Sequence, residues 1–155
     1  MSTLFATLHH AAALTLLVCT LVSIYRLWQP LTVQSARLLR NTDMLNGIAA
    51  TLILVVGMVR VFYLEKGSAY YFANGPFLAK LGFYGLASVL SLVPTLEVRR
   101  WRIPLNKGQL PTVNDQKMTV LRTVAFLQLV CLAAMATCAN LAAQGQTWPF
   151  LGSVR

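Results

Sequence analysis

The sequence predicts an all-α integral membrane protein, a single domain over residues 1–155 that folds as a four-helix transmembrane bundle. Composition is the first reason, because 57% of the residues are hydrophobic and 11% are charged, against roughly 25% charged in an average soluble domain. The second is four apolar runs, each about the 20 residues that a helix needs to cross the hydrocarbon core. The third is that most lysines and arginines lie between these runs.

Each apolar run is predicted to be a helix, because an isolated strand cannot satisfy its backbone N–H and C=O groups in lipid. Proline marks several boundaries: Pro30 follows the first run, Pro76 begins the third and Pro94 marks its end. The predicted spans are 4–24, 44–64, 76–96 and 118–142.

The basic residues predict the orientation in the membrane. The connector 25–43 carries three arginines and the connector 97–117 carries five lysines and arginines, whereas the connector between the second and third runs carries only Lys66. Basic loops stay on the cytoplasmic side. We therefore expect both termini on the outer, periplasmic or extracytoplasmic, face of a bacterial inner membrane, and we expect lipid headgroups rather than nucleic acid to meet the basic loops.

Two features of the first connector have alternative interpretations. Its apolar residues alternate with Gln34 and arginines, which is typical of a short amphipathic helix on the cytoplasmic leaflet, but a solvated loop fits equally well. Asp43 lies at the predicted start of the second span. There it is expected to cap that helix, with an ion pair to Arg40 or Arg122 as the alternative.

Small and polar residues at helical spacing predict the faces that look into the bundle, because helices in lipid associate through close packing and hydrogen bonds. The three cysteines all fall inside apolar runs and are expected to be buried packing residues rather than disulfide partners. The predicted inward stripes are Asn46, Ala50, Ile53, Gly57 and Arg60; Lys80, Tyr84, Ala87, Ser88, Ser91 and Thr95; and Gln128, Cys131, Met135 and Cys138.

Ionisable residues inside spans are rare and costly, so they are the first candidates for function. These residues are His9, His10, Arg60 and Lys80. At 1.5 Å per residue, all four lie on the order of 6–9 Å below the outer boundary. They are expected to form one polar layer, contributed by three helices.

Such a layer suits a haem b, a related tetrapyrrole or a quinone. An imidazole is a good axial ligand for haem iron, and Arg and Lys suit propionates. His9 and His10 point about 100° apart on a helix and cannot ligate opposite faces of one haem. The possibilities that remain are one histidine with Met58, Met135 or Lys80 opposite it, or with an open sixth position. Tyr84, on the inward stripe of Lys80, is a further cofactor-binding candidate. The alternative is that Arg60 and Lys80 extend to the headgroups and the histidines only pack.

One segment suggests a family. Residues 71–80 (YFANGPFLAK), followed by Ser91 to Thr95 and supported by His9 and Arg60, resemble a family of small bacterial four-span inner-membrane proteins. More distantly, the early histidine and the embedded Arg60 and Lys80 resemble HemJ-type protoporphyrinogen oxidases and CopD-like membrane proteins. The HemJ resemblance implies a haem-b protein and a membrane oxidoreductase, with His9 or His10 as ligand and Arg60 and Lys80 as substrate or anion contacts.

The leading hypothesis is therefore a small membrane redox protein that binds haem b, or a related tetrapyrrole or quinone, at the outer face. The alternative is a non-catalytic accessory or assembly subunit that docks on a larger membrane complex or forms a homo-oligomer. A transport element is a third possibility, but the sequence shows no pair of discontinuous helices. The sequence has no paired carboxylates, no phosphate-binding loop and no zinc-site spacing, so nothing in it indicates a hydrolase.

Overall fold

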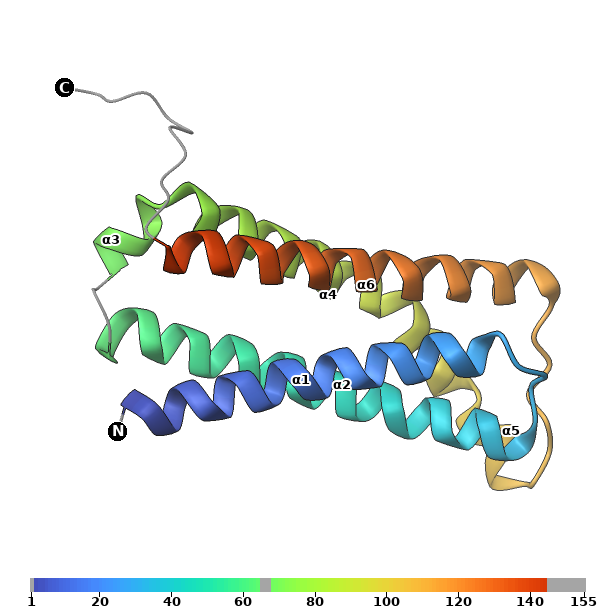
Figure 1. Cartoon of the computed structure of the whole chain (residues 1–155). Helices are drawn as coiled ribbons and strands as arrows, with labels where there is room; N and C mark the ends of the chain where they lie inside the picture. Colours follow the sequence, from blue (N-terminus) through green and yellow to red (C-terminus); the bar gives the residue numbers. More distant parts are fainter. Residues whose placement is uncertain (1, 65–67, 145–155) are drawn as a thin grey trace.

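The computed structural model describes residues 2–64 and 68–144, and within these ranges all the regular structure is helical. Figure 1 shows long helices side by side, with short elements at both ends of the bundle. The elements are α1 (Ser2–Leu27), α2 (Val33–Val59), the π-helical η1 (Arg60–Leu64), α3 (Ser68–Phe72), α4 (Gly75–Arg100), α5 (Arg102–Asn106) and α6 (Asp115–Ala143).

Four helical stretches are long and apolar enough to cross a membrane, which confirms the predicted fold class. They are 25 to 32 residues long, more than the roughly 20 that the hydrocarbon core requires. Their outward sides carry exposed aliphatic and aromatic residues such as Leu14, Val89 and Phe126. In a bilayer these side chains face lipid. The stretches are Thr3–Leu27, Val33–Leu64, Gly75–Asn106 and Asp115–Ala143.

The second span begins much earlier than predicted. Thr32 caps α2: its hydroxyl accepts a hydrogen bond from the Ser35 N–H at 3.1 Å, and the Ser35 hydroxyl accepts one from the Thr32 N–H at 2.8 Å. This reciprocal pair satisfies two N–H groups at the helix start. Residues 33–43 are therefore the first turns of α2, and both interpretations of the connector, a separate surface helix and a solvated loop, are wrong.

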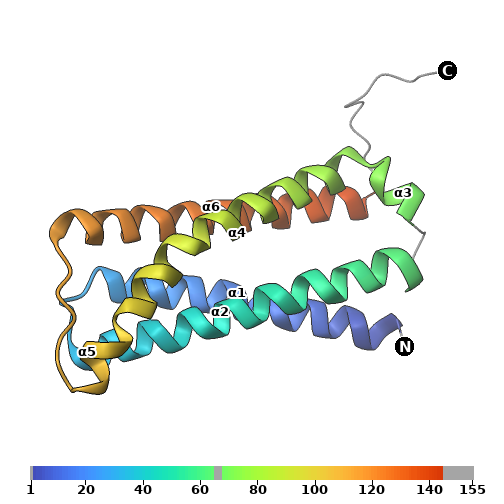
Figure 2. The same cartoon turned by 180° about the vertical axis from the view of Figure 1, so that it is seen from behind.

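The helices pack as two pairs. α1 packs mainly against α2, and α4 packs mainly against α6. α4 runs beside α6 near its start and then crosses toward α2, as Figure 2 shows from behind. Pro94 lies inside α4 rather than at its end, which corrects the predicted boundary. At the end of this path, the Arg37 side chain donates a hydrogen bond to the Leu105 carbonyl at 3.3 Å and joins α2 to α5.

The bundle has two chemically different ends. We call the end that holds the start of α1, η1, α3 and the start of α4 the terminal end, and the opposite end, with α5 and the starts of α2 and α6, the basic end. The main apolar core lies at the basic end. Its buried members are Leu27, Ala36, Leu39, Val98, Trp101, Leu105, Leu121 and Ala125.

The predicted inward faces are confirmed. Gln128, Cys131, Met135 and Cys138 are all buried on α6. Cys19 is buried on α1, and all three cysteines are free thiols, as expected of packing residues. The stripes predicted on the second and third spans contain no fully exposed residue.

Candidate functional site

His9 lies on the side of α1 that faces α2, about seven residues from the start of the helix. Its Cε1 would be 3.5 Å from a Cβ atom added to Gly57, so the missing side chain of Gly57 leaves room for the imidazole. The backbone of Ile53 is its polar neighbour on α2. The His9 Nδ1 is buried and has no hydrogen-bond partner within the described part of the chain.

The structure brings Arg60 and Lys80 near this imidazole. Both lie close enough for their charges to act on His9, although they come from η1 and α4. Arg60 begins the π-helical segment, a widened helical turn that occurs frequently at functional sites. We call His9, Arg60 and Lys80 the terminal-end cluster.

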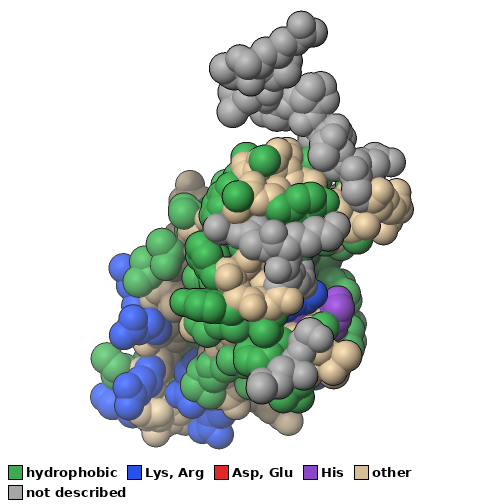
Figure 3. Space-filling view, turned by 90° about the vertical axis from the view of Figure 1, so that its left-hand side faces the viewer, with side chains coloured by type: hydrophobic (Ala, Val, Ile, Leu, Met, Phe, Trp, Pro, Cys, Tyr) green, Lys and Arg blue, Asp and Glu red, His purple; other side chains and the backbone are tan. Residues whose placement is uncertain are grey.

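His10 points away from this cluster. Its side chain is exposed, and its ring centroid lies 6.2 Å from that of His9 with the ring planes nearly perpendicular. The helix rotation that turns His9 toward α2 therefore turns His10 outward. In Figure 3, which looks onto the terminal end, a histidine side chain lies beside a basic one, apart from the larger group of Lys and Arg.

The other predicted cofactor residues differ in what they contact. The Tyr84 hydroxyl donates a hydrogen bond to the Ala50 carbonyl at 2.9 Å and links α4 to α2. Met135 is buried on α6, whereas Met58 is 36% exposed on α2. No group of three or more His, Cys, Asp or Glu side chains within residues 2–64 and 68–144 could hold a metal ion.

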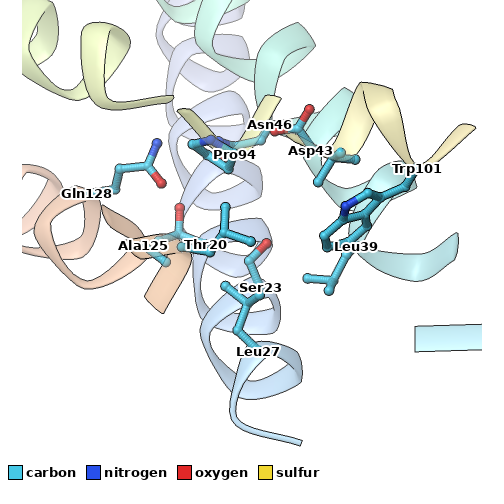
Figure 4. A pocket seen from close by; sticks show the side chains of 12 residues that line it. Thr20, Ser23, Leu27, Leu39, Asp43, Asn46, Pro94, Trp101, Ala125 and Gln128 are labelled. Atoms are coloured by element: carbon cyan, nitrogen blue, oxygen red, sulfur yellow. The ribbon is translucent and has the colours of Figure 1, made fainter. Parts of the chain in front are cut away.

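The structure also contains a polar cavity that the sequence analysis missed. It lies inside the bundle next to the basic-end core and is lined by residues of α1, α2, α4 and α6 together with Trp101 (Figure 4). Its polar lining residues are Thr20, Ser23, Asp43, Asn46, Trp101 and Gln128. We call it the Asp43 cavity. Of these polar residues, Asn46 and Gln128 were recognised as inward-facing from the sequence.

Asp43 does not cap α2, and within residues 2–64 and 68–144 it forms no ion pair with Arg40, Arg122 or any other basic residue, so both predictions for it are wrong. It lies ten residues after Val33, the first residue of α2, because Thr32 is the true cap. Its Oδ1 accepts a hydrogen bond from the Thr95 hydroxyl at 2.9 Å. The signal that would have placed it inside the span is the Thr32–Ser35 pair, which resembles a capping box with Ser in the place of Glu.

Arg122, the suggested partner of Asp43, is engaged elsewhere. Its Nε donates to the Leu27 carbonyl at 2.8 Å, and its guanidinium carbon lies 5.0 Å from the centre of the Trp28 ring. A separate, open groove near the α1–α2 turn is lined by Arg26, Arg37 and neighbouring polar residues. Two arginines beside hydroxyl and amide groups at a basic membrane edge suit lipid phosphates.

Four apolar helices around a small amount of polar interior define a multi-pass membrane protein. Residues 1–147 match the family described as "Predicted membrane protein (DUF2214)", and the chain belongs to this family. No curated protein and no solved structure matches the chain. These comparisons show no relationship to the HemJ-type oxidases or the CopD-like proteins.

Proposed function

We propose that the protein is a membrane redox protein that binds an anionic, membrane-soluble cofactor at the terminal-end cluster, and that this cofactor is haem b or a related tetrapyrrole or quinone. One observation carries the proposal. A histidine and two cationic side chains from α1, η1 and α4 converge at one level near the terminal end. Such intramembrane ionisable groups are functional candidates by default.

The donor set fits haem b. His9 supplies an imidazole to this cluster, and imidazole nitrogen is the usual axial ligand of b-type haem. Arg60 and Lys80 suit carboxylates through charge-assisted hydrogen bonds. Bound haem would supply one-electron redox chemistry. The protein's part is to orient the iron through His9 and to hold the propionates at the level of Arg60 and Lys80.

The two adjacent histidines provide a matched test. We would purify the protein in mild detergent from cells supplied with a haem precursor, and record oxidised and dithionite-reduced absorption spectra. The wild type is expected to show a Soret band, which His9→Ala abolishes and His10→Ala retains. This contrast follows from the position of His9, which is half-buried against α2, and from the exposure of His10.

The contrary results are equally specific. A folded wild-type protein without a Soret band rejects haem, and mass spectrometry of an organic extract then decides whether a quinone or another tetrapyrrole is bound. Loss of the band in His10→Ala but not in His9→Ala rejects His9 as the ligand. Arg60→Gln and Lys80→Gln are expected to lower the affinity for added haem in a titration without abolishing the Soret band. The reason is that Arg60 and Lys80 would contact the carboxylates of the haem and not its iron.

One observation favours a second candidate function, an accessory or assembly subunit. Gly82 and Gly85 are exposed on α4, and a Cβ atom at either would have no neighbour within 4 Å. Small residues on a lipid-facing side allow close approach of another transmembrane helix. Gly82→Leu and Gly85→Leu would then disrupt a complex that purifies intact with the wild type. Leu92→Ala, an exposed change farther along α4, is the control.

We also propose that the basic end faces the cytoplasm of a bacterial cell, so that the terminal-end cluster lies near the outer face. The support is the number of lysines and arginines around α5 and the starts of α2 and α6. A membrane-impermeant thiol reagent applied to intact cells should label Thr3→Cys and spare Asn106→Cys, both exposed positions. The native cysteines are buried and give a low background. The reverse labelling pattern would invert the orientation.

A further inference from the structure

The Asp43 cavity lies between the helices and is large enough for water. It offers about 40 Å³ to water-sized molecules, which is room for roughly three waters. Figure 4 shows its polar side chains converging from different helices, with Thr20 and Ser23 on α1, Asp43 and Asn46 on α2, and Gln128 on α6. A cavity of this kind, within the membrane-spanning part of the bundle, differs from the terminal-end cluster in both place and chemistry.

Two polar atoms on the cavity wall have no partner. The Asn46 Oδ1 and the Trp101 Nε1 are buried without a hydrogen bond in the described ranges, and Trp101 is only 2% exposed. Buried polar groups are nearly always hydrogen-bonded. An unpaired acceptor and an unpaired donor on one small polar cavity indicate that it holds species able to satisfy both.

Asp43 is half-buried on the wall of this cavity. At 1.5 Å per residue its position is about 15 Å along α2 from Val33. The Thr95 hydroxyl is its hydrogen-bond donor, and no described Lys, Arg or His forms an ion pair with it. An ionised carboxylate that is held by one neutral donor inside a membrane is costly.

The charged groups on the neighbouring elements do not compensate Asp43. On α4, Glu97 lies 3.3 Å from the Lys117 Nζ and 3.4 Å from the Arg100 guanidinium, so it is already paired. On α6, Arg122 is engaged by the Leu27 carbonyl and the Trp28 ring. On α2 itself, Arg40 forms no ion pair with Asp43. Apart from Asp43, the residues that line the cavity, including those of α1, are neutral.

We propose that the Asp43 cavity is a hydrated proton-binding site inside the membrane and that Asp43 is the residue that carries the proton. In the loaded state one carboxyl oxygen accepts from Thr95, and the other is protonated and donates to the Asn46 Oδ1 or to a cavity water. Asn46 follows Asp43 by three residues and shares its helix face. Water also accepts the Trp101 N–H.

The exchange step is balanced. A protonated cavity water transfers its proton to a carboxylate oxygen: one O–H bond of the hydronium breaks, one O–H bond forms on the carboxyl group, and neutral water and the neutral acid remain. Release is the reverse step, in which a neutral cavity water accepts the proton and the carboxylate is restored. No oxidant or other co-reactant is needed. The site therefore has the chemistry of a membrane-embedded proton relay, which is a recognised role of carboxylates in transmembrane helices. The inference does not depend on a cofactor at the terminal-end cluster.

Infrared difference spectroscopy tests the proposal, because it separates a protonated carboxyl group from a carboxylate. The whole chain contains four acidic residues, so assignment by substitution is practical. In nanodiscs at neutral pH the wild type should show the carbonyl band of a protonated acid, and exchange into heavy water should shift it. Asp43→Asn should remove the band, whereas Asp115→Asn, a change at an exposed position, should leave it unchanged.

Two outcomes contradict the proposal. Absence of the band in the folded wild type at neutral pH means that Asp43 is ionised, for example with an Asn46 amide nitrogen donating to it. Loss of the band on adding sodium, but not choline, at constant pH would make the cavity a sodium site. If Asp43→Asn fails to fold, Thr95→Val decides, because Thr95 donates to the carboxyl oxygen in either arrangement: a shifted carbonyl frequency supports the proposal, and an unchanged one overturns it.

Discussion

The terminal end and the basic end of the same four helices hold polar groups in opposite ways. At the terminal end, Arg60 and Lys80 lie within one to two turns of the helix ends, where long cationic side chains reach headgroups or an anionic ligand. Near the basic end, the short side chain of Asp43 is half-buried and lines a cavity next to the packed apolar core. A cation near the interface can find a partner outside the bundle, whereas a carboxylate on an internal cavity depends on hydrogen bonds from the cavity wall and from water.

The largest effect on the free energy of unfolding is expected for a substitution in the apolar core of the basic end. Leu105 on α5 is 1% exposed and belongs to the main core, whereas Ile103 on the same short helix is 70% exposed. Leu105→Ala is expected to lower the free energy of unfolding by about 2–5 kcal/mol, because it leaves a cavity. Ile103→Ala should change it little. Unfolding by a denaturing detergent, followed by circular dichroism, measures both, and equal effects would show that α5 is not part of the core.

The next effect concerns the terminal end. Gly57→Leu is expected to displace the His9 ring and to destabilise the protein by about 1–3 kcal/mol through overpacking. Gly57→Ala should be tolerated, because its Cβ would be in ordinary contact distance at 3.5 Å. Gly47→Leu, where nothing lies within 4 Å, is the control. If Gly57→Leu and Gly47→Leu unfold alike, His9 does not pack against α2.

A smaller effect is expected at the Asp43 cavity. Thr95→Val removes the hydroxyl donor of Asp43 while keeping the side-chain shape. Interhelical hydrogen bonds in membranes contribute on the order of 0.6 kcal/mol, with a maximum near 1.7 kcal/mol. Thr51→Val, where the hydroxyl bonds only to the Gly47 carbonyl of its own helix, should have a smaller effect. If both variants lower the free energy of unfolding equally in the same assay, the hydrogen bond between Thr95 and Asp43 does not stabilise the protein.

The smallest effect is expected at the rim of the basic end. Arg122→Gln removes the guanidinium contact with the Trp28 ring and changes the donor to the Leu27 carbonyl. Exposed cation–π contacts contribute about 0.5–1 kcal/mol. Arg102→Gln, an exposed change on α5 with the same loss of charge, serves as the control in the unfolding assay. If the two variants have the same free energy of unfolding, the effect of Arg122→Gln comes from the loss of charge and not from the contact with Trp28.

The number of spans and the inward stripes were predictable, but several local details were not. Gln128 and the α6 cysteines follow one helical stripe, so spacing alone placed them inside. Asp43 was misplaced because Thr32 and Ser35 are weak signals of a helix start, and an apolar run marks the hydrocarbon region rather than the whole helix. Pro94 was taken as a terminator, although proline is tolerated inside transmembrane helices.

The terminal-end cluster was predictable in depth but not in direction. Rise per residue sets how far His9, Arg60 and Lys80 lie from the helix ends, and this is a property of each helix alone. Which histidine faces inward depends on rotation about the helix axis. That rotation is set by contacts with other helices, here the space left by Gly57 on α2.

By itself, the sequence determined that this protein crosses a membrane four times and carries its basic residues mainly at one end, because hydropathy and the backbone's need for hydrogen bonds in lipid act on each segment separately. Only the tertiary structure decided that Trp101, Asp43 and Asn46 meet on one cavity and that His9 turns inward while His10 turns out. The physical reason is that these relations depend on helix crossing and rotation, which are fixed by packing between segments far apart in the chain.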